Sequence, residues 1–273
     1  MIKKIFWEIY WRTIGPYGAV TNYFVFPIMG WMRKHRLFGL DKPYDQIEKF
    51  KNKHKGERCF VIATGPSLTE SDLKLVANEK TFAVNTIFTV YDKIEWRPTY
   101  YVLDDPEYQK RLKKEHQLNF DDFAVENCFL CSLNRKISIG KKNIFLNINF
   151  LDHVYNFGKS KRFKYTGDLL FGFYDNYSVT QDAIILAIYM GFKEIYLLGA
   201  DNDYLGNKQH FGGITVAEDS TYKRAVKIQN ANDMAYEFVK KVAELYQVKI
   251  YNVTRGGKVK CFERKKLEDV IEG

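Results

Sequence analysis

A turn of small residues, Thr64 to Ser67, follows the apolar run at the start of the segment CFVIATGPSL, residues 59–68. Gly65 permits a tight turn or a close approach to a ligand, Pro66 fixes φ, and Ser67 can cap a following helix. Because amides at a helix start attract phosphate, Thr64 and these three residues are candidate ligand-binding positions. The alternative is an ordinary strand-to-helix turn, since the motif is neither a three-glycine dinucleotide fingerprint nor a Walker loop.

Polar residues also end the next two predicted strands. Asn85 closes TFAVN at 81–85, and Asp104 and Asp105 stand at the end of PTYYVLD, which covers 98–104. Asn and Asp are equally common as turn and helix-cap residues, so each one alone has a structural explanation. Together, three polar strand ends predict a rim that reads a base, a ribose and a phosphate.

A second cluster lies in NYSVTQDAIILAIYMGFKEIYLLGADNDY, residues 176–204. Ser178 or Thr180 is expected to cap a helix over 179–190, which also places Val179 at the helix start. A strand over 194–200 then leads into an acidic loop that contains a tyrosine. This arrangement predicts a sugar-phosphate site whose loop residues are Asp201, Asp203 and Tyr204.

His210 is the histidine best placed to act as a general base. Histidine is unprotonated near neutral pH, and DYLGNKQHFGG puts His210 between glycines in the long loop after the site strand. Those glycines would allow a lid over 202–228 to move. The alternative is a surface-loop histidine without a chemical role.

Short apolar runs alternate with helical patterns along the rest of the chain. The runs lie at 59–63, 81–85, 98–104, 127–132, 143–148, 194–200 and 248–253, and the helical patterns at 106–116, 179–190 and 229–246. This alternation predicts an α/β Rossmann-like sandwich, with a mostly parallel sheet and helices on both faces. We expect this domain to cover 58–273, preceded by a linker helix over 41–57.

Residues 1–40 differ in composition from the remainder, being aromatic and basic at both ends. Glu8, Arg12 and the prolines argue against a signal peptide or a spanning helix. The segment suits peripheral contact with a membrane surface. The alternative is an arm that packs against the domain or against a sister subunit in a homo-oligomer.

The chain has 273 residues, a formal net charge of +9 and four cysteines. The excess of basic residues favours anionic ligands, whereas no zinc-finger spacing or other nucleic-acid signature accompanies it. The cysteines are too few and too scattered for a disulfide framework, which fits a reducing cytosol. Cys128 and Cys131 have CxxC spacing within an apolar run, which favours buried strand thiols over redox or zinc chemistry.

Five motifs carry a resemblance to known families: ATGPSL, FAVN, LDDP, AIILAIYMGFKEIYLLGAD and YNVTRGGKVKCFER. The chain resembles the bacterial family 42 sialyltransferases and the wider group that contains the 6-hydroxymethylpterin diphosphokinase-like proteins. In the sialyltransferases the corresponding positions hold a cytidine nucleotide. Here they are Thr64, Asn85, Asp105 and Val179–Thr180, of which only Asn85 is unchanged.

The resemblance implies an inverting glycosyltransferase that uses a nucleotide sugar, for example CMP-linked, and needs no metal. His210 would be the base, with Asp201 and Tyr204 at the reaction centre, and the acceptor would be a glycan or a lipid-linked molecule at the inner face of the cytoplasmic membrane. One alternative is a UDP- or GDP-sugar transferase that holds Mg²⁺ or Mn²⁺ through Asp201 and Asp203. Another is ATP-dependent pyrophosphoryl transfer of the pterin diphosphokinase type.

Overall fold

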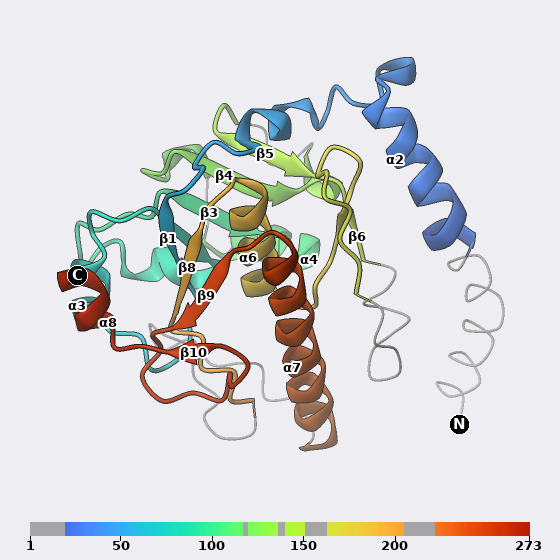
Figure 1. Ribbon diagram of the computed structural model, residues 1–273. Coiled ribbons are helices and arrows are strands. Elements are labelled where there is room, and N and C mark those ends of the chain that lie inside the picture. Colours follow the sequence, from blue (N-terminus) through green and yellow to red (C-terminus); the bar gives the residue numbers. More distant parts are fainter. Residues whose placement is uncertain (1–19, 117–119, 136–139, 151–162, 205–221) are drawn as a thin grey trace, which may run out of the picture.

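The computed structural model describes residues 20–116, 120–135, 140–150, 163–204 and 222–273 (Figure 1). Residues 1–19, His210 and most of the predicted lid therefore lie outside the described residues.

The core is an eight-stranded parallel sheet in the order β10-β9-β8-β1-β2-β3-β4-β5. Its strands are β1 (Arg58–Ile62), β2 (Thr81–Val84), β3 (Tyr100–Leu103), β4 (Asn127–Cys131), β5 (Asn143–Leu146), β8 (Glu194–Leu198), β9 (Lys249–Asn252) and β10 (Glu263–Arg264). A separate parallel pair is formed by β6 (Ile148–Asn149) and β7 (Phe173–Tyr174). The central strands are buried on both faces, which is why they read as continuous apolar runs. The predicted Rossmann-like α/β fold is confirmed.

Helices cover both faces of this sheet (Figure 1). They are α2 (Phe26–Lys34), α3 (Glu70–Leu75), α4 (Pro106–His116), α6 (Val179–Tyr189), α7 (Tyr222–Leu245) and α8 (Leu267–Glu272). The two faces of the sheet have separate hydrophobic cores, as strand β2 shows. Phe82 and Val84 share one core with α6 and α7, whereas Ala83 is in the other core with α3 and α8. Every residue of α6 is buried, as expected for a helix that is apolar on all sides after its polar first turn and lies between the sheet and α7.

Short helices complete the chain. They are the π-helix η1 (Thr21–Val25) and the 3₁₀ helices η2 (Leu37–Gly39), η3 (Asp45–Phe50), η4 (Asn85–Val90), η5 (Phe120–Asp122) and η6 (Ser132–Asn134).

Two segment boundaries differ from the prediction. Residues 222–228, expected in the lid, form the first two turns of α7, because the polar start of this helix reads as a loop. The predicted linker over 41–57 packs onto the domain, since Ile47 and Phe50 of η3 are in the core. Its His54 Nε2 lies 2.7 Å from the Tyr100 hydroxyl and its ring stacks on Phe192.

Helix α2 attaches to the domain along one narrow face. Arg33 is buried and donates through Nε to the Leu170 carbonyl at 3.3 Å. A Cβ at Gly30 would lie 2.7 Å from Phe171, so only glycine permits this close approach. The opposite side of the helix exposes large apolar side chains. No helix in the described part of the chain is long and apolar enough to span a membrane.

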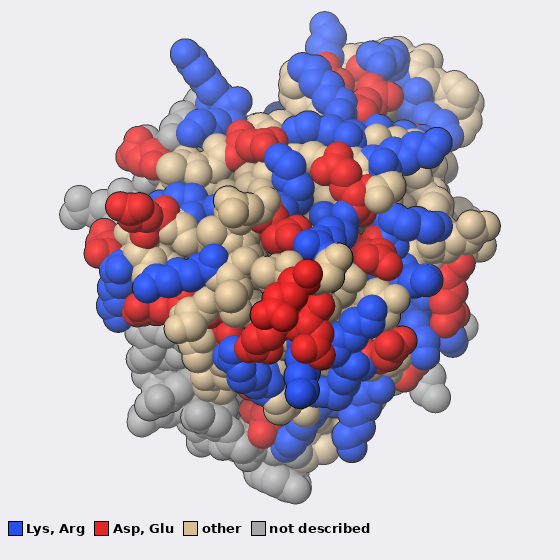
Figure 2. Space-filling view, turned by 60° about the vertical axis from the view of Figure 1, so that its left-hand side comes forward, with Lys and Arg blue, Asp and Glu red and all other residues tan. Residues whose placement is uncertain are grey.

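The face in Figure 2 carries Lys and Arg side chains interspersed with Asp and Glu side chains. The net positive charge of the chain is therefore not gathered into a single basic patch on this face.

Candidate functional site

The sheet order reverses at β1. From there the chain builds β2 to β5 on one side, and β8 to β10 lie on the other. In open parallel sheets the crevice outside the carboxyl ends of the strands at such a switch point is the usual ligand site. Here β1 and β8 are the adjacent strands, so the turn after β1 and the acidic loop after β8 leave the sheet side by side.

A cavity of about 100 Å³ lies at this point. The sequence-predicted residues that line it are Thr64, Gly65, Pro66, Asn85, Ser178, Thr180, Asp201, Asp203 and Tyr204. They come from the ends of β1, β2 and β8 and from the start of α6, segments that are far apart in sequence. The structure therefore brings together most of the predicted site.

Ser67 has a different role from the one predicted. Helix α3 begins at Glu70 and is capped by Thr69 in a capping box with Asp72, so Ser67 is not the cap. Instead the Ser67 hydroxyl donates to Asp201 Oδ2 at 2.7 Å, and the Ser67 amide donates to the same oxygen at 3.3 Å. The Ser67 amide therefore already has a hydrogen-bond acceptor within the protein. The turn that was expected to bind phosphate instead joins the loop after β1 to the loop after β8.

Gly65 is required by that contact. Its amide donates to the Gly199 carbonyl at 2.9 Å, and a Cβ at Gly65 would lie 1.9 Å from Asp201 Oδ2. Burial raises the pKa of the Asp201 carboxyl, and the hydrogen bonds from Ser67 oppose that rise. Asp201 therefore orders the loop.

The start of α6 also lines the cavity, through Ser178 and Thr180. Ser178 is the N-cap, and its hydroxyl oxygen accepts from the Thr180 amide at 3.4 Å. The positive end of the helix dipole adds to the hydroxyl groups of Ser178 and Thr180. Val179, also predicted at the site, is buried in the core instead, because its side chain points toward the sheet.

Asn85 reaches the cavity through an unusual backbone conformation. Its φ is 50°, in the left-handed region, and its carbonyl accepts from the buried Tyr101 hydroxyl at 2.6 Å. Asn tolerates this conformation better than most residues with a side chain. The hydrogen bond from β3 holds the Asn85 backbone at the rim.

Comparison with known proteins adds a family. The sequence model of the 6-hydroxymethylpterin diphosphokinase MptE-like family matches residues 36–207. The chain belongs to this family. A search of curated proteins found no match.

Two solved structures resemble this MptE-like protein. The MAf glycosyltransferase from Magnetospirillum magneticum AMB-1 is 14% identical, with a TM-score of 0.51 over 82% of this chain and 38% of that one. The sialyltransferase CstII from Campylobacter jejuni, solved with cytidine-5'-monophosphate, is 18% identical, with a TM-score of 0.42 over 77% of this chain and 85% of that one. The first likeness shows a shared fold, and the chain spans less than half of that larger protein.

Helix α7 supplies residues of the MptE-like site that sequence reasoning missed. Asn232 and Tyr236 line the cavity, and Gln229 accepts from the Tyr204 amide at 3.2 Å. Asn232 also accepts from Gln181 of α6 at 3.1 Å, and burial raises the pKa of Tyr204. The sequence feature that could have identified them is the spacing of Gln229, Asn232 and Tyr236 by three and four, which puts these polar side chains on one face of α7.

Asp203, the second carboxylate of the acidic loop after β8, also has a partner. Its Oδ1 pairs with Lys258 Nζ at 2.7 Å, whereas Asp201 accepts from Ser67. The Lys258 amide donates to the Asp201 carbonyl at 2.7 Å, so the tail after β9 supports the same loop.

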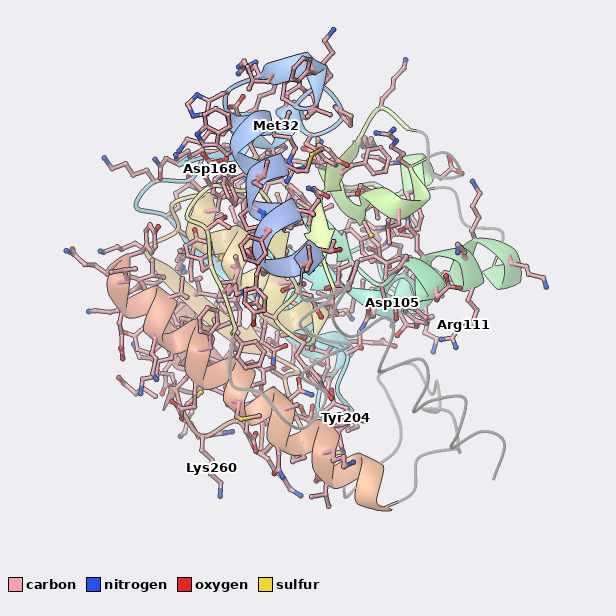
Figure 3. The ribbon with its side chains drawn as sticks, turned by 90° about the vertical axis from the view of Figure 1, so that its right-hand side faces the viewer. Met32, Asp105, Arg111, Asp168, Tyr204 and Lys260 are labelled. Carbon is pink, nitrogen blue, oxygen red and sulfur yellow. The ribbon has the colours of Figure 1, made fainter. Side chains whose placement is uncertain are left out.

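Asp104 and Asp105 do not line the cavity, contrary to the prediction. The exposed Asp105 caps α4, accepting from the Glu107 amide at 2.8 Å and the Tyr108 amide at 3.0 Å. Figure 3 shows Asp105 at the start of α4 and Tyr204 beside α7. Strand β3 is two strands away from β1, which explains why its end does not reach the switch point.

Asp104 instead faces Asp182 of α6 and Asp175, which follows β7. All three carboxylates are buried, and one oxygen from each lies within 4.8 Å of the others. Burial raises the pKa of Asp104 to about 6, and a hydrogen bond with Asp182 opposes that rise. Burial and repulsion by Asp104 and Asp175 raise the pKa of Asp182 well above its usual range.

Proposed function

We propose that this MptE-like protein is a glycosyltransferase that moves a sugar from a nucleotide-sugar donor to a glycan or lipid-linked acceptor. The observation that carries the proposal is the cavity at the β1–β8 switch point, where a helix start, an amide side chain and a tyrosine converge. Its volume suits a phosphate group, so the base and the sugar would extend from it. The shared fold with the MAf glycosyltransferase supports sugar transfer by analogy.

The site residues divide into groups that bind and groups that react. The start of α6, with Ser178 and Thr180, would hold the donor phosphate as it becomes the leaving group. Asn85 would bind the ribose or the base, and the Tyr204 hydroxyl would donate to a phosphate oxygen. His210, outside the described residues, is proposed as the base that removes the acceptor proton during an inverting transfer.

A cytidine-linked donor and a mechanism without metal are part of the same proposal. The complex of CstII with cytidine-5'-monophosphate suggests which nucleotide to test first. In the alternative metal-dependent UDP- or GDP-sugar transferase, a cation would have to displace Ser67 from Asp201 and Lys258 from Asp203.

A second candidate function is ATP-dependent pyrophosphoryl transfer. Two observations favour it: the family to which the chain belongs is described as diphosphokinase-like, and a buried carboxylate cluster lies beside α6. Such a transfer needs a divalent cation to neutralise the phosphates.

Thermal unfolding with CMP, UDP, GDP or ATP, each with and without EDTA, tests these functions. A nucleotide at 100 times its Kd stabilises the folded protein by about 2.7 kcal/mol. For a chain of this size that raises the Tm by about 5–10 °C. A rise with CMP that persists in EDTA supports the first function. A rise with ATP alone that EDTA removes supports the second, and no rise with any nucleotide contradicts both.

We also propose that α2 places the protein at the inner face of the cytoplasmic membrane. Phe24 of the preceding π-helix η1 and Ile28 and Trp31 of α2 are spaced by four and three and are 64%, 56% and 53% exposed. Lys34 and Arg36, both more than half exposed, follow at the end of this stripe, where Lys34 pairs with Asp168 at 3.6 Å and Arg36 with Glu48 at 2.7 Å. An exposed apolar stripe beside basic side chains suits an interface with anionic lipid. Pairing of two such stripes in a homo-oligomer is the alternative.

A further inference from the structure

The buried carboxylates of Asp104, Asp175 and Asp182 form a cluster apart from the cavity described above. We propose that these three residues bind a divalent cation of the Mg²⁺, Mn²⁺ or Ca²⁺ type beside the start of α6. The proposal concerns a different set of acids from Asp201 and Asp203.

The spacing of the cluster fits a hard cation. One oxygen from each carboxylate lies within 4.8 Å of the other two. Ligands on opposite sides of Mg²⁺ are about 4.2 Å apart, and those of Ca²⁺ are about 5 Å apart, from bond lengths of about 2.1 and 2.5 Å. Small side-chain movements would therefore bring all three oxygens onto one ion. An all-oxygen ligand set favours these cations over the softer transition metals.

A second observation points to a missing partner. Asp104 and Asp182 are 5% and 0% exposed. In the part of the chain that the structure describes, Asp104 Oδ2 and Asp182 Oδ2 have no hydrogen-bond donor, except that a proton on one of these two carboxyls could be donated to the other. Among the described residues, neither carboxylate forms an ion pair with Lys or Arg. The buried Asp72 offers a contrast, because it pairs with Arg255 at 2.5 Å. Burying carboxylates without a compensating cation is costly.

The remaining oxygens are held by hydrogen bonds that orient the cluster. Asp182 Oδ1 accepts from the Asn176 amide at 3.0 Å and from Asn176 Nδ2 at 2.7 Å. Asp175 Oδ1 accepts from the Tyr177 amide at 3.1 Å. Such contacts fix ligand side chains before an ion arrives, as the outer shell of a metal site does.

The position of the cluster suggests what the cation would do. Asp182 lies one helical turn after Ser178, whose neighbour Thr180 also lines the cavity. A cation bound there would neutralise the carboxylates beside a helix start that holds phosphate. The cation would be a structural ion that holds the start of α6 in place, without contact with the donor, so it is compatible with a transfer that needs no catalytic metal. Its binding does not depend on the proposed function.

The test is cation binding by the full chain without nucleotide. Titration with Mn²⁺, followed by electron paramagnetic resonance of the free ion, should show one saturable site, and Mg²⁺ should compete for it. Thermal unfolding should show a Tm rise of about 5–10 °C at 100 times the Kd.

Asp182→Asn and Asp104→Asn should each abolish this site. Asp182→Asn is expected to fold, because its amide oxygen can still accept from Asn176 and its nitrogen can donate to Asp104. Asp105→Asn is the matched control, since Asp105 is the exposed neighbour of Asp104 and Asn also caps helices. The control should bind Mn²⁺ as the wild type does.

Three results would overturn the proposal: no saturable Mn²⁺ binding, as expected if the two carboxyls share a proton; binding that survives both substitutions; or binding lost only in Asp203→Asn. CMP binding measured in EDTA reports on the proposed function separately, so failure of one does not imply failure of the other.

Discussion

At the scale of single residues, the site depends on one close contact between loops that are more than 130 residues apart. Gly65 permits it, and Asp201 makes it through Ser67. The tightness of this contact makes it a sensitive place to test whether the cavity binds the donor.

Gly65→Ala should lower the free energy of unfolding by about 1–3 kcal/mol, because the new Cβ meets Asp201 Oδ2 and the Gly199 carbonyl. It should also remove the Tm rise caused by nucleotide. The turn after β1 would have to shift to make room for the Cβ, which would change the wall of the cavity where the nucleotide is proposed to bind. Both are measured by thermal unfolding. Gly56→Ala is the control: no atom lies within 4 Å of its added Cβ, so only the cost of its positive φ, about 1 kcal/mol, should remain. Unchanged nucleotide binding in Gly65→Ala would argue against a donor in this cavity.

Thr180→Val removes a hydroxyl at the start of α6 while keeping the shape of the side chain. A hydrogen bond to a charged phosphate contributes about 1.5–3 kcal/mol, so nucleotide affinity should fall by about 10- to 100-fold. Calorimetric titration with the nucleotide that stabilises the wild type measures this. Thr86→Val makes the same change at a buried threonine that does not line the cavity and whose hydroxyl oxygen has no hydrogen-bond partner among the described residues. Equal affinities in the two variants would contradict an anion site at α6.

At the scale of elements, α2 has two faces with different partners. Gly30 and Arg33 attach it to the loop before β7, while Ile28 and Trp31, together with Phe24 of the adjoining η1, are exposed. An element fixed on one side and apolar on the other is suited to join the domain to a second surface.

Replacing Phe24, Ile28 and Trp31 together by Ser should abolish binding to vesicles that contain phosphatidylserine. Each apolar side chain buried in lipid contributes about 1.5–3 kcal/mol, so the combined loss should exceed about 100-fold in partitioning. Vesicle co-sedimentation measures this, and the Tm should change little because the three side chains are exposed. Leu133→Ser with Leu245→Ser is the control, since these leucines are 70% and 76% exposed and belong neither to η1 nor to α2. If the wild type fails to sediment but forms a dimer that the triple variant loses, the stripe is a subunit interface.

At the scale of the whole molecule, the proposed donor-binding groups lie among the described residues, and the proposed base lies outside them. Binding and turnover should therefore separate in one substitution. His210→Asn should lower the rate of sugar transfer by about 100- to 10,000-fold, the usual contribution of a general base.

The same variant should keep the nucleotide-induced Tm rise of the wild type. Transfer is measured as nucleotide release in the presence of acceptor, and His116→Asn is the control histidine change. A variant that loses binding along with turnover would mean that His210 contacts the donor rather than the acceptor hydroxyl.

The sequence by itself predicted the fold and most of the site. Continuous apolar runs identified seven strands of the main sheet to within two residues at each end, because strands buried on both faces need such runs. The two-residue strands β6, β7 and β10 are too short to leave such a run. Parallel strands have all their carboxyl ends at one edge, so Thr64, Asn85 and Asp201 had to emerge at the same side of the sheet.

Only the tertiary structure decided which of those residues meet. The order of strands put β8 beside β1 and left β3 two strands away, so Asp201 contacts Ser67 while Asp104 faces Asp182. The packing of α7 on α6, which is also a tertiary contact, brought Asn232 to the cavity. Local patterns of polar and apolar residues record which side chains are buried. Strand order is set by the packing of segments far apart in the chain, and no local pattern encodes it.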